Sequence, residues 1–163
     1  MIDAFGTWLE ATRLSTFVNS SPWIWAACET LHFIGLAVLI GTAGLLDLRL
    51  LGFFRRLPVA PLRALLPWMI GAFALNLCTG FMFLAGSPFQ YIHNIAFGLK
   101  LLFIVLAGVN ALVFTATASR AALEVGPDMQ VSPVGRVCGA VSLISWFAVV
   151  YFGRMLPYMG QGY

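Results

Sequence analysis

The sequence predicts an all-α integral membrane protein: an up-down bundle of four helices, preceded by an amphipathic helix on the membrane surface. Apolar residues make up 61% of the 163 residues and charged residues only 9%, a composition outside the range of soluble domains. Apolar stretches long enough to cross a bilayer, for which about 20 residues suffice, recur four times. We therefore expect residues 1–163 to form one transmembrane domain.

The N-terminal segment lacks the basic start and the continuous apolar stretch of a secretory signal peptide. Over about residues 3–18, Phe5, Trp8 and Phe17 alternate at roughly helical spacing with Glu10 and Arg13. This pattern is typical of a helix that lies flat in the membrane interface.

Signals for helix ends separate the four predicted spans. Ser21 and Pro22 supply an N-cap and a first-turn proline for the first span. Pro67 lies so near the start of the second span that it removes no helical hydrogen bond. Pro88 follows the second span, and Pro127 marks the loop before the fourth. The spans cover about residues 23–48, 65–86, 94–118 and 136–158.

The arginines predict the orientation of these spans. The second connection, residues 86–94, contains no Lys or Arg. Under the positive-inside rule, the arginine-bearing first and third connections face the cytoplasm and both chain termini face the periplasm of a bacterium. We therefore expect a multi-pass protein of the bacterial inner membrane, and no nucleic-acid partner. The arginines of the two inner connections are Arg49, Arg55, Arg56, Arg63, Arg120 and Arg136.

Five ionisable residues fall in the outer half of the predicted bundle: Glu29, His32, His93, Lys100 and Arg154. Charged groups in a bilayer usually face the bundle interior and pair with one another. We therefore expect an ion-pair network in which Glu29 pairs with Lys100 or Arg154. Two simpler interpretations stay open: Arg154 and His93 extend to the lipid headgroups, and His32 makes a hydrogen bond between helices.

Haem is a sharper interpretation of the two histidines. A haem b takes imidazole ligands from helices of an apolar, aromatic bundle, with cations near its propionates. His32 and His93 would be the iron ligands, and Lys100 and Arg154 would neutralise the propionates. His93 lies roughly 5–15 Å shallower than His32, so ligation by His32 alone, or by His32 with a methionine such as Met82 or Met155, stays open. The sequence has no CxxCH motif for covalent attachment.

Two stretches, ETLHFIGLAVLIGTAGLLDLRLLG (29–52) and FGLKLLFIVLAGVNALVF (97–114), carry a resemblance to known families. They resemble an uncharacterised bacterial family of four-helix integral-membrane proteins. More distantly, they are similar to the haem-binding membrane protoporphyrinogen oxidase and copper-resistance D membrane families. The resemblance places the oxidase family's first-helix histidine on His32, its arginine on Arg49 and its third-helix lysine on Lys100. Where the oxidase pattern has further histidines, this chain has Gly98 and Asn110.

These observations favour a cytochrome-b-like protein that binds one haem b near the periplasmic side. It would transfer electrons between the quinone pool and a periplasmic redox partner, either alone or as an oxidoreductase subunit of a larger membrane complex. The alternatives are a membrane carrier or binding protein for a metal ion or small solute, and a non-catalytic scaffold subunit. Motifs of soluble enzymes, such as GxGxxG or HExxH, do not occur.

Overall fold

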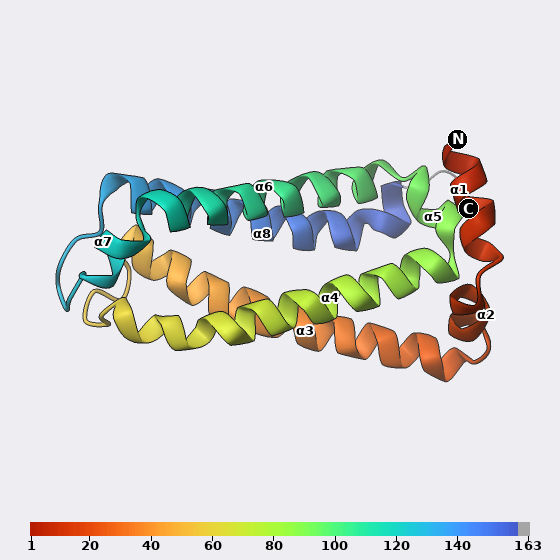
Figure 1. Cartoon of the computed structure of the whole chain (residues 1–163), viewed down its shortest axis with the longest axis horizontal. Helices are drawn as coiled ribbons and strands as arrows, with labels where there is room; N and C mark the ends of the chain where they lie inside the picture. The colour runs from red at the N-terminus through yellow and green to blue at the C-terminus, as the bar shows by residue number, and fades with distance from the viewer. Residues whose placement is uncertain (160–163) are drawn as a thin grey trace.

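The computed structural model describes residues 1–159, which form helices and no strand, so the predicted all-α class is confirmed for them. Four helical segments in this part of the chain are long and apolar enough to cross a membrane, and each overlaps one of the predicted apolar stretches. They lie side by side along the long axis of the molecule (Figure 1). They are α3 (Pro22–Leu51), α4 (Leu66–Gly86) with the 3-10 turn η1 (Ala60–Leu65) before it, α6 (Ile95–Thr117) and α8 (Pro133–Met159).

The long helices pack in the order α4, α3, α8, α6. Figure 1 shows the result as two pairs, α3 with α4 and α6 with α8, joined through α3 and α8. Glycines allow the close approaches. A Cβ atom on Gly35 of α3 would lie 2.6 Å from Asn76 Nδ2 of α4, and one on Gly139 of α8 would lie 3.0 Å from the Asp47 carbonyl of α3.

Most of the surface of the long helices is apolar and is not covered by the rest of the chain. In the most apolar window of each segment, only 6% to 28% of the residues are buried. Large side chains such as Leu102, Ile144 and Phe147 are 59%, 64% and 66% exposed. A surface of this size and composition fits hydrocarbon better than water.

One end of the array is crossed by two short helices, α1 (Ile2–Glu10) and α2 (Arg13–Asn19) (Figure 1). The sequence predicted one helix over about residues 3–18, but the chain breaks at Thr12. Its backbone is extended, with φ −76° and ψ 152°, and its hydroxyl accepts a hydrogen bond from the Ser15 N–H. Thr12 is thus the N-cap of a second helix. A third short helix, α5 (Pro88–Ile92), fills the connection at this end.

The opposite end carries α7 (Ser119–Leu123) and the two arginine-bearing connections. We call it the basic end, because it holds Arg49, Arg55, Arg56, Arg63, Arg120 and Arg136. A small apolar cluster joins the connections to the end of α3 there. Its buried members are Leu50, Val59, Ala122, Val125 and Val131.

Candidate functional site

His32 lies on the side of α3 that packs against α4, about 15 Å along the helix from its first residue. Its ring is half-buried, and its Nδ1 atom is 2.7 Å from Oγ1 of Thr79 on α4. The ring also meets Phe83 edge-to-face, with 5.4 Å between the ring centroids. Its Cε1 atom lies 3.9 Å from where a Cβ atom on Gly80 would stand. The ring therefore packs over a glycine of α4.

The hydrogen bonds of Thr79 assign the proton of this imidazole. The Thr79 hydroxyl has one proton, which it donates to the Leu75 carbonyl of its own helix at 2.8 Å. With that proton on the Leu75 carbonyl, the Thr79 oxygen is an acceptor toward His32, and we infer from this that Nδ1 of His32 carries the hydrogen. Nε2 is then unprotonated in the neutral ring, and it has no hydrogen-bond partner among residues 1–159. This arrangement orients a free imidazole lone pair, as partners of metal-binding histidines do.

Lys100 supplies a cation to the same half of the molecule. It is half-buried on α6, and its side chain lies over Gly153 of α8, with Nζ 3.6 Å from where a Cβ atom on that glycine would stand. Within the part of the chain that the structure describes, no carboxylate oxygen lies within 4 Å of its ammonium group.

The expected pairing of Glu29 with Lys100 or Arg154 does not occur in the described residues. Glu29, on α3, and Arg154, on α8, are both exposed. Glu29 instead acts on Tyr91 of α5. Burial, and to a smaller extent the nearby Glu29 carboxylate, raises the pKa of the Tyr91 phenol above its ordinary value.

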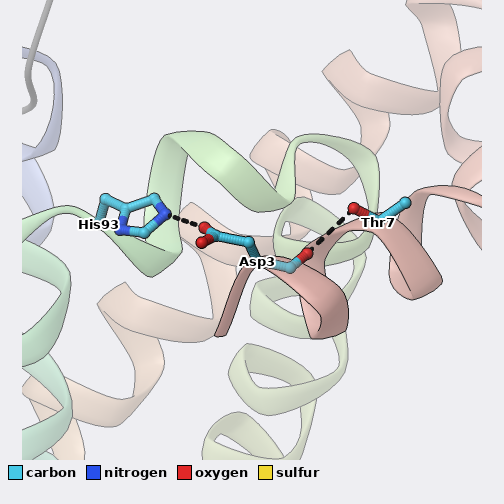
Figure 2. A network of polar contacts seen from close by, with 3 residues as sticks. All are labelled: Asp3, Thr7 and His93. Carbon is cyan, nitrogen blue, oxygen red and sulfur yellow. Dashed lines mark hydrogen bonds and ion pairs between the residues drawn. The ribbon is translucent and has the colours of Figure 1, made fainter. Parts of the chain in front are cut away.

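His93 lies apart from His32, on the outer surface at the α1 end. Its Nε2 atom is 2.7 Å from Oδ1 of Asp3 in α1, as Figure 2 shows, and its side chain is 54% exposed. The Asp3 carbonyl in turn accepts a hydrogen bond from the Thr7 hydroxyl at 3.0 Å. His93 thus connects the N-terminal helix to the bundle, and the structure does not bring the two histidines together.

The other sulfur and nitrogen ligands do not gather around His32 either. Met82 lies on the same α3–α4 seam, but its sulfur is 3.6 Å from the Cys28 thiol. Residues 1–159 contain no group of three His, Cys, Asp or Glu side chains that could hold a metal ion. An apolar groove of about 450 Å³ lies between α6 and α8, and none of the five predicted site residues lines it.

Two residues of this region were not singled out in the sequence: Thr79, which orients His32, and Asp3, which binds His93. Thr79 carried a signal that could have been found, since a hydroxyl inside an apolar span is free to bond across a helix seam. Asp3 carried none, because it is separated from His93 by 90 residues.

Comparison of the chain with protein-family models, with curated proteins and with solved structures found no match. The resemblance to the haem-binding oxidase family therefore stays an expectation drawn from the two quoted stretches.

Proposed function

We propose that the protein is a multi-pass protein of the bacterial inner membrane that binds one haem b in the half of the bundle near α1. His32 would be the one residue of this chain that binds the haem iron, through Nε2. The observation that carries the proposal is the 2.7 Å contact between His32 Nδ1 and Thr79 Oγ1, which supports a tautomer whose Nε2 is free. Bound haem iron would supply one-electron chemistry, which fits transfer between the quinone pool and a periplasmic redox partner.

Other residues fit the surroundings of such a group. Phe83 and Trp25, whose ring centroids are 5.2 Å apart, give the His32 region an aromatic wall. Lys100 has no carboxylate partner among the described residues, so its charge is available to a propionate. Arg154 is exposed near the end of α8 and would reach a propionate only at the edge of the bundle. His93 is 54% exposed at the end of α5 and is not brought to the His32 region, so we do not propose it as the second ligand.

The test is the absorption spectrum of the full chain, purified in mild detergent after expression with ample haem. We expect a Soret band that shifts on reduction by dithionite. The His32→Ala variant should lose it, and the His93→Ala variant should keep it, because His93 lies apart from the His32 region at the end of α5. A colourless wild-type protein would overturn the proposal, and loss of the band in both variants would replace it by ligation from both histidines.

A second function has support from one observation. The half-buried Lys100, with no carboxylate near it in residues 1–159, is suited to an anionic small solute, as in a membrane carrier or binding protein. Stabilisation of colourless protein by small carboxylates, lost in Lys100→Gln, would favour this alternative. If neither haem nor solute binds, the scaffold subunit of a membrane complex is the reading that is left.

A further inference from the structure

The apolar groove between α6 and α8 is separate from the His32 region. It is lined on α6 by residues between Leu106 and Val113 and on α8 by residues between Pro133 and Val141, and its volume is about 450 Å³. Its one polar side chain, Asn110, donates from Nδ2 to the Cys138 carbonyl at 3.0 Å. The groove therefore presents hydrocarbon almost everywhere.

The residues on the seam between α6 and α8 explain why it is open here. Toward the α1 end the same two helices are joined by Phe103 and Phe152, whose rings stack with centroids 5.7 Å apart. Toward the basic end the corresponding positions are valines, among them Val113 and Val137. A valine side chain is too short to reach across the seam, so a trough remains along it.

The shape and polarity of the trough restrict its occupant. It opens sideways on the apolar surface of the bundle, where Val109 is 52% exposed and Val137 is 62% exposed. A polar or charged solute would find no hydrogen-bond partner in it. A hydrocarbon chain that lies along the helices fills such a trough without this cost.

Charge at the end of the groove adds a second requirement for the occupant, which is a negative charge. The groove reaches Pro133, the first residue of α8, at the basic end. The basic end has six arginines against three carboxylates, those of Asp47, Glu124 and Asp128, and so accounts for the whole net charge of +3. The first turn of the 27-residue α8 adds the partial positive charge of a helix N-terminus, although Ser132 Oγ already accepts from the Gly135 N–H. One turn further along α8, Nη2 of Arg136 donates a hydrogen bond to Oε1 of Gln130 at 2.6 Å. The buried Nε of Arg136 has no hydrogen-bond partner among the described residues.

We propose that this groove is a binding site for an anionic phospholipid of the leaflet at the basic end. One acyl chain lies in the trough between α6 and α8, and the phosphate lies at the start of α8, near Arg136 and among the other arginines of the basic end. Basic surfaces between membrane helices commonly select anionic lipids in this way. The inference is independent of haem or solute binding in the other half of the molecule.

The experiment uses the full-length protein in mild detergent and an equimolar mixture of phosphatidylglycerol and phosphatidylcholine with identical acyl chains. Native mass spectrometry measures the lipid that stays bound. We expect phosphatidylglycerol to be retained in preference. Val137→Trp, which fills the trough, should reduce its retention about tenfold, a change of about 1.4 kcal/mol. The control is Val105→Trp, because Val105 is also a valine of this surface, 63% exposed, but lies outside the groove.

A second pair of variants tests the headgroup. Arg120→Gln combined with Arg136→Gln should remove the preference for phosphatidylglycerol, whereas Arg13→Gln, at the other end of the molecule, should preserve it. Equal retention in Val137→Trp and Val105→Trp would overturn the acyl-chain site. Equal retention of the two lipids by the wild-type protein would overturn the anionic headgroup. A lipid-free dimer that Val137→Trp dissociates would assign the groove to a second copy of the chain.

Discussion

The guanidinium of Arg49, in the last turn of α3, donates a hydrogen bond from Nη2 to the carbonyl of Gly126 at 3.2 Å, across 77 residues of sequence. The same side chain donates from Nε to the Leu57 carbonyl. Arg49 thus holds the first and the third connections together, and it is fully buried, with 0% of its surface exposed. The sequence suggested Arg49 as an orientation signal. In the fold it also joins two loops, and we call this link the Arg49 clamp.

Replacement of this clamp should destabilise the basic end. Arg49→Met keeps the length of the stem but leaves the Leu57 and Gly126 carbonyls without a donor, and we expect a loss of about 2–4 kcal/mol in the free energy of unfolding. Arg49→Lys should recover little of it, because one ammonium cannot reproduce the two directions of the guanidinium fork. Reversible unfolding in mixed micelles measures the change.

Arg55→Lys is the matched control, because Arg55 is exposed and its Nε bonds only the Gly52 carbonyl, at 3.3 Å. It should unfold like the wild type. If Arg49→Lys were as stable as Arg55→Lys, the guanidinium geometry would be irrelevant. The proposed link between the two connections through Arg49 would then be wrong.

Thr79→Val should change the tautomer of His32. Valine has the shape of threonine but no acceptor, so the Nδ1 hydrogen loses its partner and the Nε2-protonated form gains population. The chain has only two histidines, so ¹⁵N NMR of labelled protein separates their imidazoles. We expect the Nδ1-protonated form in the wild type and in Thr79→Ser, and a stability loss of about 0.5–2 kcal/mol in Thr79→Val. An Nε2-protonated ring in the wild type would contradict the assignment.

The long helices could be predicted because their signal is local. Each is an apolar stretch of sufficient length, and its ends carry cap residues and prolines, as Ser21 and Pro22 do for α3. The break in the N-terminal helix also had a local cause, the Thr12 N-cap, which a search for apolar spacing alone does not detect.

The candidate site could be predicted only in part, because directions of side chains depend on helix starts and on partners far along the chain. The third predicted span begins at about residue 94, directly after His93, whereas α6 begins at Ile95, with Asn94 as its N-cap. His93 belongs to the end of α5, and its side chain follows a different course, toward Asp3. The role of Arg49 could not be predicted for another reason. Its partners are backbone carbonyls, which every residue has, so no residue type in the sequence indicates them.

The α3–α4 contact should be sensitive to one methyl group. A Cβ atom on Gly35 would lie 2.6 Å from Asn76 Nδ2, which is tied to the Ala72 carbonyl at 2.9 Å. Gly35→Ala must therefore break that bond or separate the helices, at a cost of about 1–3 kcal/mol. Gly41→Ala, on the same helix but with no atom within 4 Å, should be neutral or stabilising by up to about 1 kcal/mol. Thermal unfolding of the two variants in one detergent compares them, and equal midpoints would show that the helices are not closely packed at Gly35.

Packing, rather than the exposed ion pair, should hold α1 on the bundle. The Asp3–His93 pair is 74% and 54% exposed, and such pairs contribute only about 0.2–1 kcal/mol. Gly6, by contrast, is buried against α5, and a Cβ atom there would lie 3.0 Å from side-chain atoms of Phe89 and Ile92. Gly6→Val should therefore raise amide hydrogen exchange over residues 2–10 about tenfold or more, whereas Asp3→Asn should raise it less than about fivefold. Ala4→Val, at an exposed position of α1, controls for the lower helix propensity of valine. A larger effect of Asp3→Asn than of Gly6→Val would reverse this order and make the ion pair the main contact of α1.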